Sequence, residues 1–282
     1  MNHFLIVSNP YKDKDLMVTN QIKDILESYG KKCTIDANQK EIDITMEYNK
    51  ILNVPQDTDC VIVLGGDGTL IRTAREIMET KIPIMGVNLG TLGYLTDVEV
   101  KDIENYLKEL FKGNYHIEER MRLFATVRHN DFIQEDNALN EICLTRAGSL
   151  KVLSFHLYVN GEYLYTYHAD GMIFATPTGS TAYNLSAGGP IVEPGAKMMV
   201  LTPICPHSLN TRSIVISDED QITIEIPDNG MGQAQEAEIN FDGRRICRVK
   251  TGDVIQISKS TKTTKLIKFG HTSFLETVHK KM

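Results

Sequence analysis

The segment Gly65-Gly66-Asp67-Gly68-Thr69 has the composition of a phosphate-binding turn. It follows the apolar run 60–64 and precedes a helical pattern, so a strand, a turn and a helix are expected in that order. Glycines allow positive φ angles and close approach of the backbone to a ligand, while the N–H groups and dipole of a helix N-terminus favour anions. We therefore expect Gly65, Gly66, Gly68 and Thr69 to bind phosphate.

Asp67 is the unusual member of this turn, because a carboxylate repels phosphate unless it has a task. It could accept a proton from an attacking hydroxyl group, or help to place a metal ion. The alternative is a structural turn in which Asp67 caps the following helix. The sequence contains no GxxxxGK[ST] loop, and no GxGxxG follows the first apolar run, so the two commonest nucleotide-binding loops are not expected.

The hydrophobic pattern changes near residue 120. Before this point, short apolar runs alternate with helical periodicity, which indicates a parallel sheet covered on both faces. The expected strands are 4–7, 60–64 and 82–87, and the expected helices lie within 18–29, 70–78 and 100–111. Beyond it, period-two patterns predominate, and Asn160-Gly161 between two alternating runs predicts a hairpin.

Two domains are therefore expected: an α/β domain over residues 1–118 and a β-rich domain over residues 119–265. Residues 266–282 follow neither pattern and are candidates to pack back onto the first domain. Within the β-rich domain, one short helix is expected around 179–187. Further strands are expected at 213–217, 221–226, 237–241 and 254–259.

The composition argues against several classes of protein. A formal net charge of −7, without a basic tract, gives no general attraction for nucleic acid or anionic lipid. The five cysteines are scattered and include no CxxC pair, so reduced thiols are expected and no metal site. No apolar stretch approaches the ~20 residues that span a bilayer, and the N-terminus lacks a basic signal region, so a cytoplasmic protein is expected.

The glycine turn resembles the signature of a kinase superfamily that includes NAD kinases, diacylglycerol and sphingosine-type lipid kinases, and 6-phosphofructokinases. Four further blocks are similar to those of NAD kinases and keep their order along the chain. They are residues 86–97, Asn140-Glu141, residues 170–191 and the weaker match Asp242-Gly243-Arg244. The open alternatives are a lipid kinase of the same superfamily and a non-catalytic NAD-binding protein.

The resemblance implies a Rossmann-like N-terminal domain with a parallel sheet and an all-β, sandwich-like C-terminal domain. It implies transfer of the γ-phosphoryl group of ATP, or of another donor such as polyphosphate, to the 2′-hydroxyl of the adenosine ribose of NAD, giving NADP. It also implies Mg²⁺ carried with the nucleotide and a homodimer or homotetramer. The donor range, the use of NADH and inhibition by NADP stay open.

The resemblance further implies the residues of the site. Asp67 would face the ribose 2′-hydroxyl, Asn140 and Glu141 would hold the ribose and adenine, and Asp170 would accept from the nicotinamide carboxamide. The full set of expected NAD contacts is Asp67, Gly68, Tyr94, Asn140, Glu141, His168, Asp170, Thr178, Thr181, Ala182, Tyr183 and Ser186. Lys12, Arg72 and Arg244 are candidates for phosphate binding, with solvent-facing or ion-paired side chains as the alternative.

Overall fold

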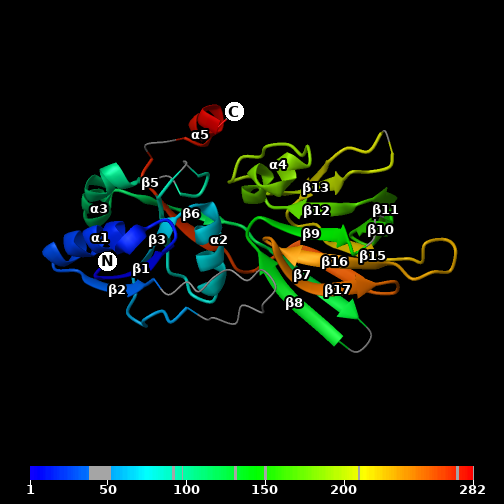
Figure 1. Ribbon diagram of the computed structural model, residues 1–282. Coiled ribbons are helices and arrows are strands. Elements are labelled where there is room, and N and C mark those ends of the chain that lie inside the picture. Colours follow the sequence, from blue (N-terminus) through cyan, green and yellow to red (C-terminus); the bar gives the residue numbers. More distant parts are fainter. Residues whose placement is uncertain are drawn as a thin grey trace. The chain divides into compact units, whose positions relative to one another are not determined.

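The structure is a computed structural model, and it separates into two compact units (Figure 1). The first unit comprises residues 1–120 and 264–282, and the second comprises residues 121–263. The residues described are 1–37, 52–90, 93–96, 98–129, 132–148, 151–208, 210–270 and 273–281.

The first unit is built on a seven-stranded sheet with the order β2-β1-β3-β4-β19-β6, in which β5 also pairs with β4. All its pairings are parallel except that of β6 with β19. The strands are β1 (His3–Ser8), β2 (Lys32–Asp36), β3 (Cys60–Gly65), β4 (Ile84–Asn88), β5 (Val98–Glu99), β6 (His116–Arg120) and β19 (Thr264–Lys268). The end of the chain thus inserts a strand between β4 and β6.

Helices cover both faces of this sheet. Met85 and Val87 of β4 pack in one core with the buried residues of α1 and α3, whereas Leu70 of α2 lies against Gly86, which points to the opposite face. The helices are α1 (Met17–Ser28), α2 (Asp67–Glu76), α3 (Ile103–Lys112) and α5 (Phe274–Lys281), with short 3-10 turns η1 (Lys14–Leu16) and η2 (Val100–Asp102). No helix in the described part of the chain is long and apolar enough to cross a membrane.

The second unit contains two six-stranded antiparallel sheets. The first has the order β11-β10-β15-β18-β7-β8, with β7 (Leu123–His129), β8 (Phe132–Ala138), β10 (Leu153–Val159), β11 (Glu162–Ala169), β15 (Ile222–Glu225) and β18 (Val254–Lys259). The second has the order β14-β13-β12-β9-β16-β17, with β9 (Glu141–Arg146), β12 (Gly171–Ala175), β13 (Met198–Ile204), β14 (Ile214–Ser217), β16 (Glu236–Phe241) and β17 (Arg244–Lys250). One hydrophobic core receives side chains from both sheets, as in a sandwich.

The expected combination of an α/β fold and an all-β sandwich-like fold is confirmed. The expected hairpin is present between β10 and β11, and both Asn160 (φ +52°) and Gly161 (φ +82°) adopt the left-handed conformation of such turns. A second left-handed pair, Asp242 (φ +49°) and Gly243 (φ +76°), joins β16 to β17. The expected helix near 179–187 is two short pieces, η3 (Thr178–Thr181) and α4 (Tyr183–Ser186).

Candidate functional site

The glycine turn joins the end of β3 to the start of α2. A Cβ atom on Gly65 would lie 2.4 Å from Thr69 Oγ1, so this position must be glycine, whereas Gly68 has open space around it. None of the three glycines in this turn adopts a positive φ angle, and Gly66 is extended at φ −123°. The glycines are needed for close packing and access, not for a left-handed backbone.

Lys12 lies beside this turn. A Cβ atom on Gly66 would be 3.2 Å from Lys12 Nζ. Buried Asp13 holds the adjoining chain by accepting hydrogen bonds from the backbone N–H groups of Val18 and Thr19, each at 2.9 Å. The ammonium group and the N-terminus of α2 therefore face the same small region, which suits an anion.

The other two candidate cations lie elsewhere. Arg72 is half-buried, with its Nε 3.9 Å from Glu76 Oε1, one helical turn further from the glycine turn. Arg244 is the first residue of β17, in the second unit. Lys12 is thus the candidate cation that the structure places at the glycine turn.

Asp67 is the first residue of α2, but its carboxylate does not cap that helix. Its Oδ2 atom accepts a hydrogen bond from the Tyr94 N–H at 2.8 Å. Its Oδ1 atom accepts from the N–H groups of Leu95 and Thr96, both at 3.1 Å, and from Thr96 Oγ1 at 3.0 Å. The side chain thus binds three successive backbone donors of a segment 27 to 29 residues away.

This segment is shaped to receive the carboxylate. A Cβ atom on Gly93 would lie 1.9 Å from Asp67 Oδ1, so only glycine fits. Asn88, at the end of β4, donates through Nδ2 to the Thr96 carbonyl oxygen at 3.3 Å. The expected motif block 86–97 therefore contacts Asp67 directly, although Thr91, Leu92 and Asp97 lie outside the described residues.

Tyr94 is covered by the C-terminal segment of its own unit. The ring of Phe274 lies 6.5 Å from the Tyr94 ring, and Lys281 Nζ lies 4.7 Å from the Tyr94 ring centroid. Lys268 of β19 donates to the Leu95 carbonyl oxygen at 3.4 Å. The last strand and helix of the chain therefore support the segment that binds Asp67.

In the second unit, Asn140 and Glu141 lie at the start of β9, beside the end of β12. A Cβ atom on Gly179 would lie 2.1 Å from the Asn140 carbonyl oxygen, so glycine allows η3 to approach this point. Asn140 and Glu141 are both 8% exposed, and Asn140 Oδ1 and Glu141 Oε2 are buried without a hydrogen-bond partner. Buried polar atoms are nearly always paired, so these two atoms are candidates to bind a ligand.

Burial raises the pKa of the Glu141 carboxyl group to about 8, and the nearby charge of Asp242 raises it further in the same direction. Glu141 is therefore mostly neutral at pH 7 and carries a hydroxyl donor as well as an acceptor. A neutral carboxyl group of this kind suits a ligand hydroxyl group, which also both donates and accepts.

Asp170 and His168 lie at the opposite end of β12. Arg146, at the end of β9, donates through Nε to Asp170 Oδ1 at 2.9 Å. His168 is exposed, and its Nδ1 lies 2.8 Å from Ser154 Oγ. Four residue steps of β12 separate this end from Asn140 and Glu141, which is about 13 Å along an extended strand.

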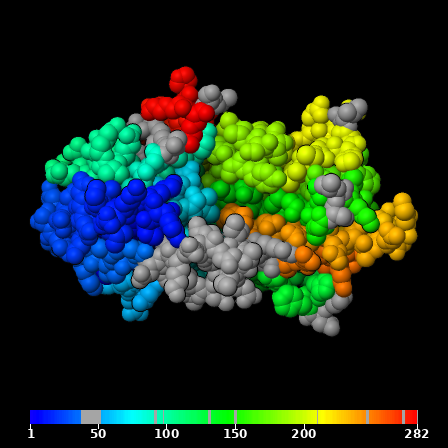
Figure 2. Space-filling view, in the orientation of Figure 1, coloured from blue at the N-terminus to red at the C-terminus, as the bar shows by residue number. Residues whose placement is uncertain are grey.

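Tyr183 lies near acidic groups at both ends of β12. Its pKa is raised by burial and then by nearby acidic groups that include both Asp170 and Glu141. The side chain is nevertheless 44% exposed, and α4 forms part of the surface of the second unit in Figure 2. Its ring is thus available to a ligand that lies along this face of the sheet.

The remaining expected residues lie in η3 and α4, the two short helical segments on either side of Ala182. Thr178 is buried in η3, and Thr181 donates through Oγ1 to the Thr178 carbonyl oxygen at 3.3 Å. Ala182 is half-buried between η3 and α4, and Ser186 is exposed at the end of α4. Buried Asn184 braces the segment by donating to the carbonyl oxygens of Ser180 and Pro190 at 3.0 Å. The segment is therefore held rigidly over the sheet.

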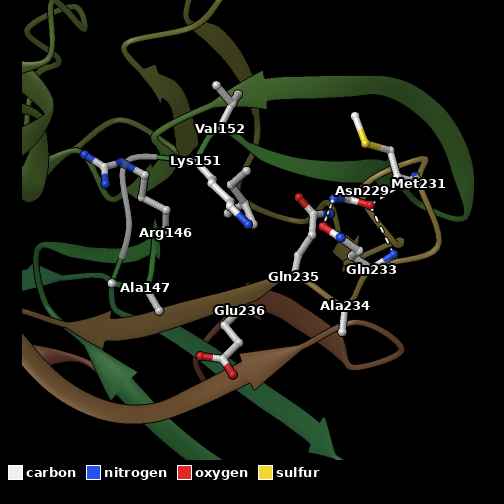
Figure 3. Close-up of a pocket in the computed structure, with 12 residues that line it drawn as sticks. Arg146, Ala147, Lys151, Val152, Asn229, Met231, Gln233, Ala234, Gln235 and Glu236 are labelled. Atoms are coloured by element: carbon white, nitrogen blue, oxygen red, sulfur yellow. Dashed lines mark hydrogen bonds between the residues drawn. The ribbon is translucent and has the colours of Figure 1, made fainter.

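Arg146 also lines a cavity of about 780 Å³ (Figure 3). Lys151, Asn229, Gln233 and Gln235 contribute polar groups to it. None of the expected NAD contacts lines this cavity. Among the described residues, no group of three or more His, Cys, Asp or Glu side chains could hold a metal ion.

Asp242 belongs to the weaker motif match, but no role in the site was expected for it. Asp242 accepts hydrogen bonds from the backbone N–H groups of Leu139 (2.8 Å), Asn140 (2.7 Å) and Glu141 (3.2 Å). The signal in the sequence was Asp-Gly between two alternating runs, which predicts a hairpin turn but says nothing about the segment that its carboxylate contacts.

Comparisons with known proteins agree with the motifs. The ATP-NAD kinase N-terminal domain matches residues 4–115, and the ATP-NAD kinase C-terminal domain matches residues 139–269. The NAD kinase of Lachnospira eligens is 46% identical over 100% of both chains. The NAD kinase of Agathobacter rectalis is 43% identical over 100% of this chain and 99% of that protein.

Solved structures are similar over the full length. The NAD kinase of Archaeoglobus fulgidus in complex with ATP has a TM-score of 0.76 and 25% identity, and the match covers 99% of this chain and 98% of that chain. Yeast NADH kinase complexed with NADH has a TM-score of 0.85 and 24% identity, covering 100% of this chain and 87% of that chain. At this identity, the yeast structure supports the fold alone.

Proposed function

Because the chain belongs to the ATP-NAD kinase family, we propose a reaction centre at Asp67 and an NAD site built on Asn140, Glu141 and the segment that carries Tyr183. The protein is an NAD kinase: it transfers the γ-phosphoryl group of ATP to the 2′-hydroxyl of the adenosine ribose of NAD and forms NADP. The family match decides against a lipid kinase of the same superfamily.

We propose that Asp67 orients the ribose hydroxyl for in-line attack on the γ-phosphorus. Its Oδ1 atom already accepts three hydrogen bonds, whereas Oδ2 accepts one, from Tyr94. The Oδ2 atom therefore keeps room for a hydroxyl donor. Because phosphoryl transfer has a loose transition state, an acceptor held in a fixed position contributes mainly through orientation.

We propose that NAD lies along the face of the second unit that carries Asn140, Glu141 and Tyr183. The two unpartnered buried oxygen atoms would bind the ribose and adenine. Thr178, Thr181 and Tyr183 would surround the adenine, with Ser186 near the ribose and phosphate. Asp170 and Ala182 would contact the nicotinamide end, near His168, and Tyr94 would stack on a base.

We propose that the phosphates of the substrates bind at Lys12, the backbone of Gly66 and Gly68, and the N-terminus of α2. The observation that supports this is the position of Lys12 Nζ against Gly66. Magnesium would enter as the complex with the triphosphate, since that ion commonly keeps several waters and binds substrate phosphates. The ion pair with Glu76 gives Arg72 a structural alternative, and Arg244 is kept as a lesser candidate.

We further propose a homodimer or homotetramer that acts in the cytoplasm. Sheet edges in the β-rich unit offer surfaces that another copy can cover. The five cysteines are all unpaired, as in a reducing compartment. Size measurement by light scattering tests the assembly.

The proposed role of Asp67 is tested with purified protein, NAD, ATP and Mg²⁺, with NADP detected by an NADP-specific dehydrogenase. The Asp67→Asn variant should lose at least ~100-fold in kcat. The control is Thr96→Val, which removes the hydroxyl donor to Asp67 Oδ1 and the acceptor of one Asn88 Nδ2 hydrogen bond, and which should lose far less. Equal kcat values in wild type and Asp67→Asn would reduce Asp67 to a structural part of the turn.

A further inference from the structure

The β16–β17 turn holds a carboxylate in a conformation that needs support. Asp242 has φ +49° and is followed by Gly243 at φ +76°, so the two residues form the left-handed pair of a tight hairpin. Aspartate tolerates this region better than most residues, and glycine tolerates it freely. The turn fixes the direction of the Asp242 side chain relative to β16.

That side chain clamps the start of β9. Its two oxygen atoms accept from three successive N–H groups, those of Leu139, Asn140 and Glu141. In return, the Asp242 N–H donates to the Glu141 carbonyl oxygen at 3.0 Å. The contact spans 101 to 103 residues of sequence, so it fixes a segment that has no local reason to adopt its position.

The clamped segment carries the two unpartnered atoms of the site. Asn140 Oδ1 and Glu141 Oε2 are buried and have no hydrogen-bond partner. The backbone of Asn140 is also held from the other side, because its carbonyl oxygen accepts from the Thr176 N–H at 2.8 Å. The backbone that carries these two side chains is therefore held by hydrogen bonds to both its N–H and its C=O groups.

We infer that Asp242 is a positioning residue for NAD, which acts by fixing Asn140 and Glu141 in the orientation that meets the ribose and adenine. The inference rests on the proposed NAD-binding role of those two residues. Asp242 itself needs no contact with substrate, since its oxygen atoms are engaged by backbone donors.

The charge of Asp242 also affects the pKa of Glu141. It supports the raised pKa of Glu141, whose largest cause is burial. Among the described residues, Cys143 on the same strand and Tyr183 on α4 have pKa values that burial raises first and the charge of Glu141 raises further. All of these neighbours are acidic groups, so removing the Asp242 charge should lower the pKa of Glu141 while leaving it above its ordinary value.

Two variants of different severity test the inference. Asp242→Asn keeps a side-chain oxygen for two of the three N–H donors and tolerates the left-handed backbone, whereas Asp242→Gly keeps the turn and removes the clamp. The KM for NAD should rise about 10-fold in Asp242→Asn and about 100-fold in Asp242→Gly, with kcat and the KM for ATP changed much less. The pH midpoint near 8 that Glu141 imparts to kcat/KM for NAD should move to lower pH in Asp242→Asn.

Asp253→Asn is the matched control. Asp253 lies in the turn between β17 and β18 of the same unit and is buried, whereas Asp242 is half-buried. It accepts from the Lys250 N–H at 2.7 Å, but its second partner is His129 rather than the 139–141 segment. This variant should lose thermal stability without a change in the KM for NAD or in the pH midpoint. Matching behaviour of Asp242→Asn and Asp253→Asn would overturn the inference.

Asn140→Ala and Glu141→Gln separate this inference from the proposed function. A raised KM for NAD in these two variants with an unchanged KM in both Asp242 variants would overturn the positioning role alone. An unchanged KM for NAD in Asn140→Ala and Glu141→Gln would overturn the proposed NAD site and the inference together.

Discussion

Each unit of this NAD kinase contains an aspartate whose carboxylate accepts hydrogen bonds from three successive backbone N–H groups. In the first unit, Asp67 binds the backbone N–H groups of residues 94–96, and in the second, Asp242 binds those of residues 139–141. Asp67 starts a helix and gains the Thr96 hydroxyl as a fourth donor, whereas Asp242 sits in a left-handed turn and returns a hydrogen bond to the segment that it holds. Each carboxylate fixes a segment distant in sequence.

The difference lies in which partner faces the ligand. In the first unit, the segment that is held buries Leu95 and Thr96, so we assign the chemistry to the carboxylate. In the second unit, the segment carries the unpartnered Asn140 and Glu141 oxygen atoms, so we assign binding to the segment and support to the carboxylate. The hydrogen bonds that a carboxylate accepts from backbone donors therefore do not assign its role. The role follows from which polar atoms nearby still have room for a ligand.

The largest expected effect comes from adding a side-chain atom beside the Asp67 carboxylate. Gly93→Ala would place a Cβ atom 1.9 Å from Asp67 Oδ1, so the carboxylate and the segment must separate. We expect a loss of about 1000-fold in kcat/KM, as for removal of a fixed electrostatic contact in an active site. Steady-state kinetics and thermal unfolding measure it.

Gly68→Ala serves as the stability control for this variant, since nothing lies within 4 Å of the added atom. It should unfold at the wild-type temperature. Near-normal activity in Gly93→Ala would contradict the assigned geometry of the Asp67 clamp.

A smaller effect is expected from crowding the segment held by Asp242. Gly179→Ala would place a Cβ atom 2.1 Å from the Asn140 carbonyl oxygen and so displace Asn140 or η3. We expect a loss of about 100-fold in kcat/KM for NAD, mostly through KM, because the displacement misplaces binding groups by about 1 Å.

Gly195→Ala is the control in the same unit, because this glycine has no atom within 4 Å of the added Cβ and no positive φ angle. It should leave the KM for NAD unchanged. If Gly179→Ala lowered kcat alone and left the KM for NAD unchanged, the assignment of NAD binding to the 139–141 segment would be wrong.

The smallest expected effect concerns stability and pH. The folded pKa of Glu141 is raised to about 8 from 4.5, so the folded state binds a proton that the unfolded state lacks between these values. Wild-type stability should therefore be greatest below about pH 4.5 with respect to this group and fall as pH rises towards 8. Glu141→Gln lacks this fall, and its stability relative to wild type should increase by about 2 kcal/mol between about pH 5.5 and 7.5.

Chemical denaturation of both proteins at the two pH values measures the difference, and Glu135→Gln, at an exposed strand position, supplies the control. Parallel stability curves for wild type and Glu141→Gln would mean that Glu141 is ionised in the folded protein. In that case the second unit would hold two adjacent negative charges, and the supporting role of Asp242 would need revision.

Patterns within one element were enough to predict the fold class. The apolar run 60–64 and the Asn160-Gly161 turn each depend on local periodicity and backbone conformation, and both have the expected structure. The strand β19 escaped prediction because its identity comes from its neighbours β4 and β6, which lie far away in sequence.

The candidate site divides in the same way. The glycine turn and the Asn140-Glu141 pair are visible as motifs, and resemblance supplied their proposed roles. The partners of Asp67 and Asp242 are not visible, because each contact joins residues that approach only after the sheets have formed. A side chain such as Arg72 shows the converse: its charge made it a candidate, and its local ion pair with Glu76 supplies another use.

The strand β19 also has a consequence for how the protein is made. During synthesis, residues 1–120 leave the ribosome first, but their sheet lacks the strand that separates β4 from β6 until the last residues of the chain follow. Lys268 and Phe274, which support the segment bound by Asp67, arrive with that strand and the helix after it. A chain that stops before residue 264 therefore lacks this strand and both of these contacts, and we expect it to leave the segment that binds Asp67 unsupported.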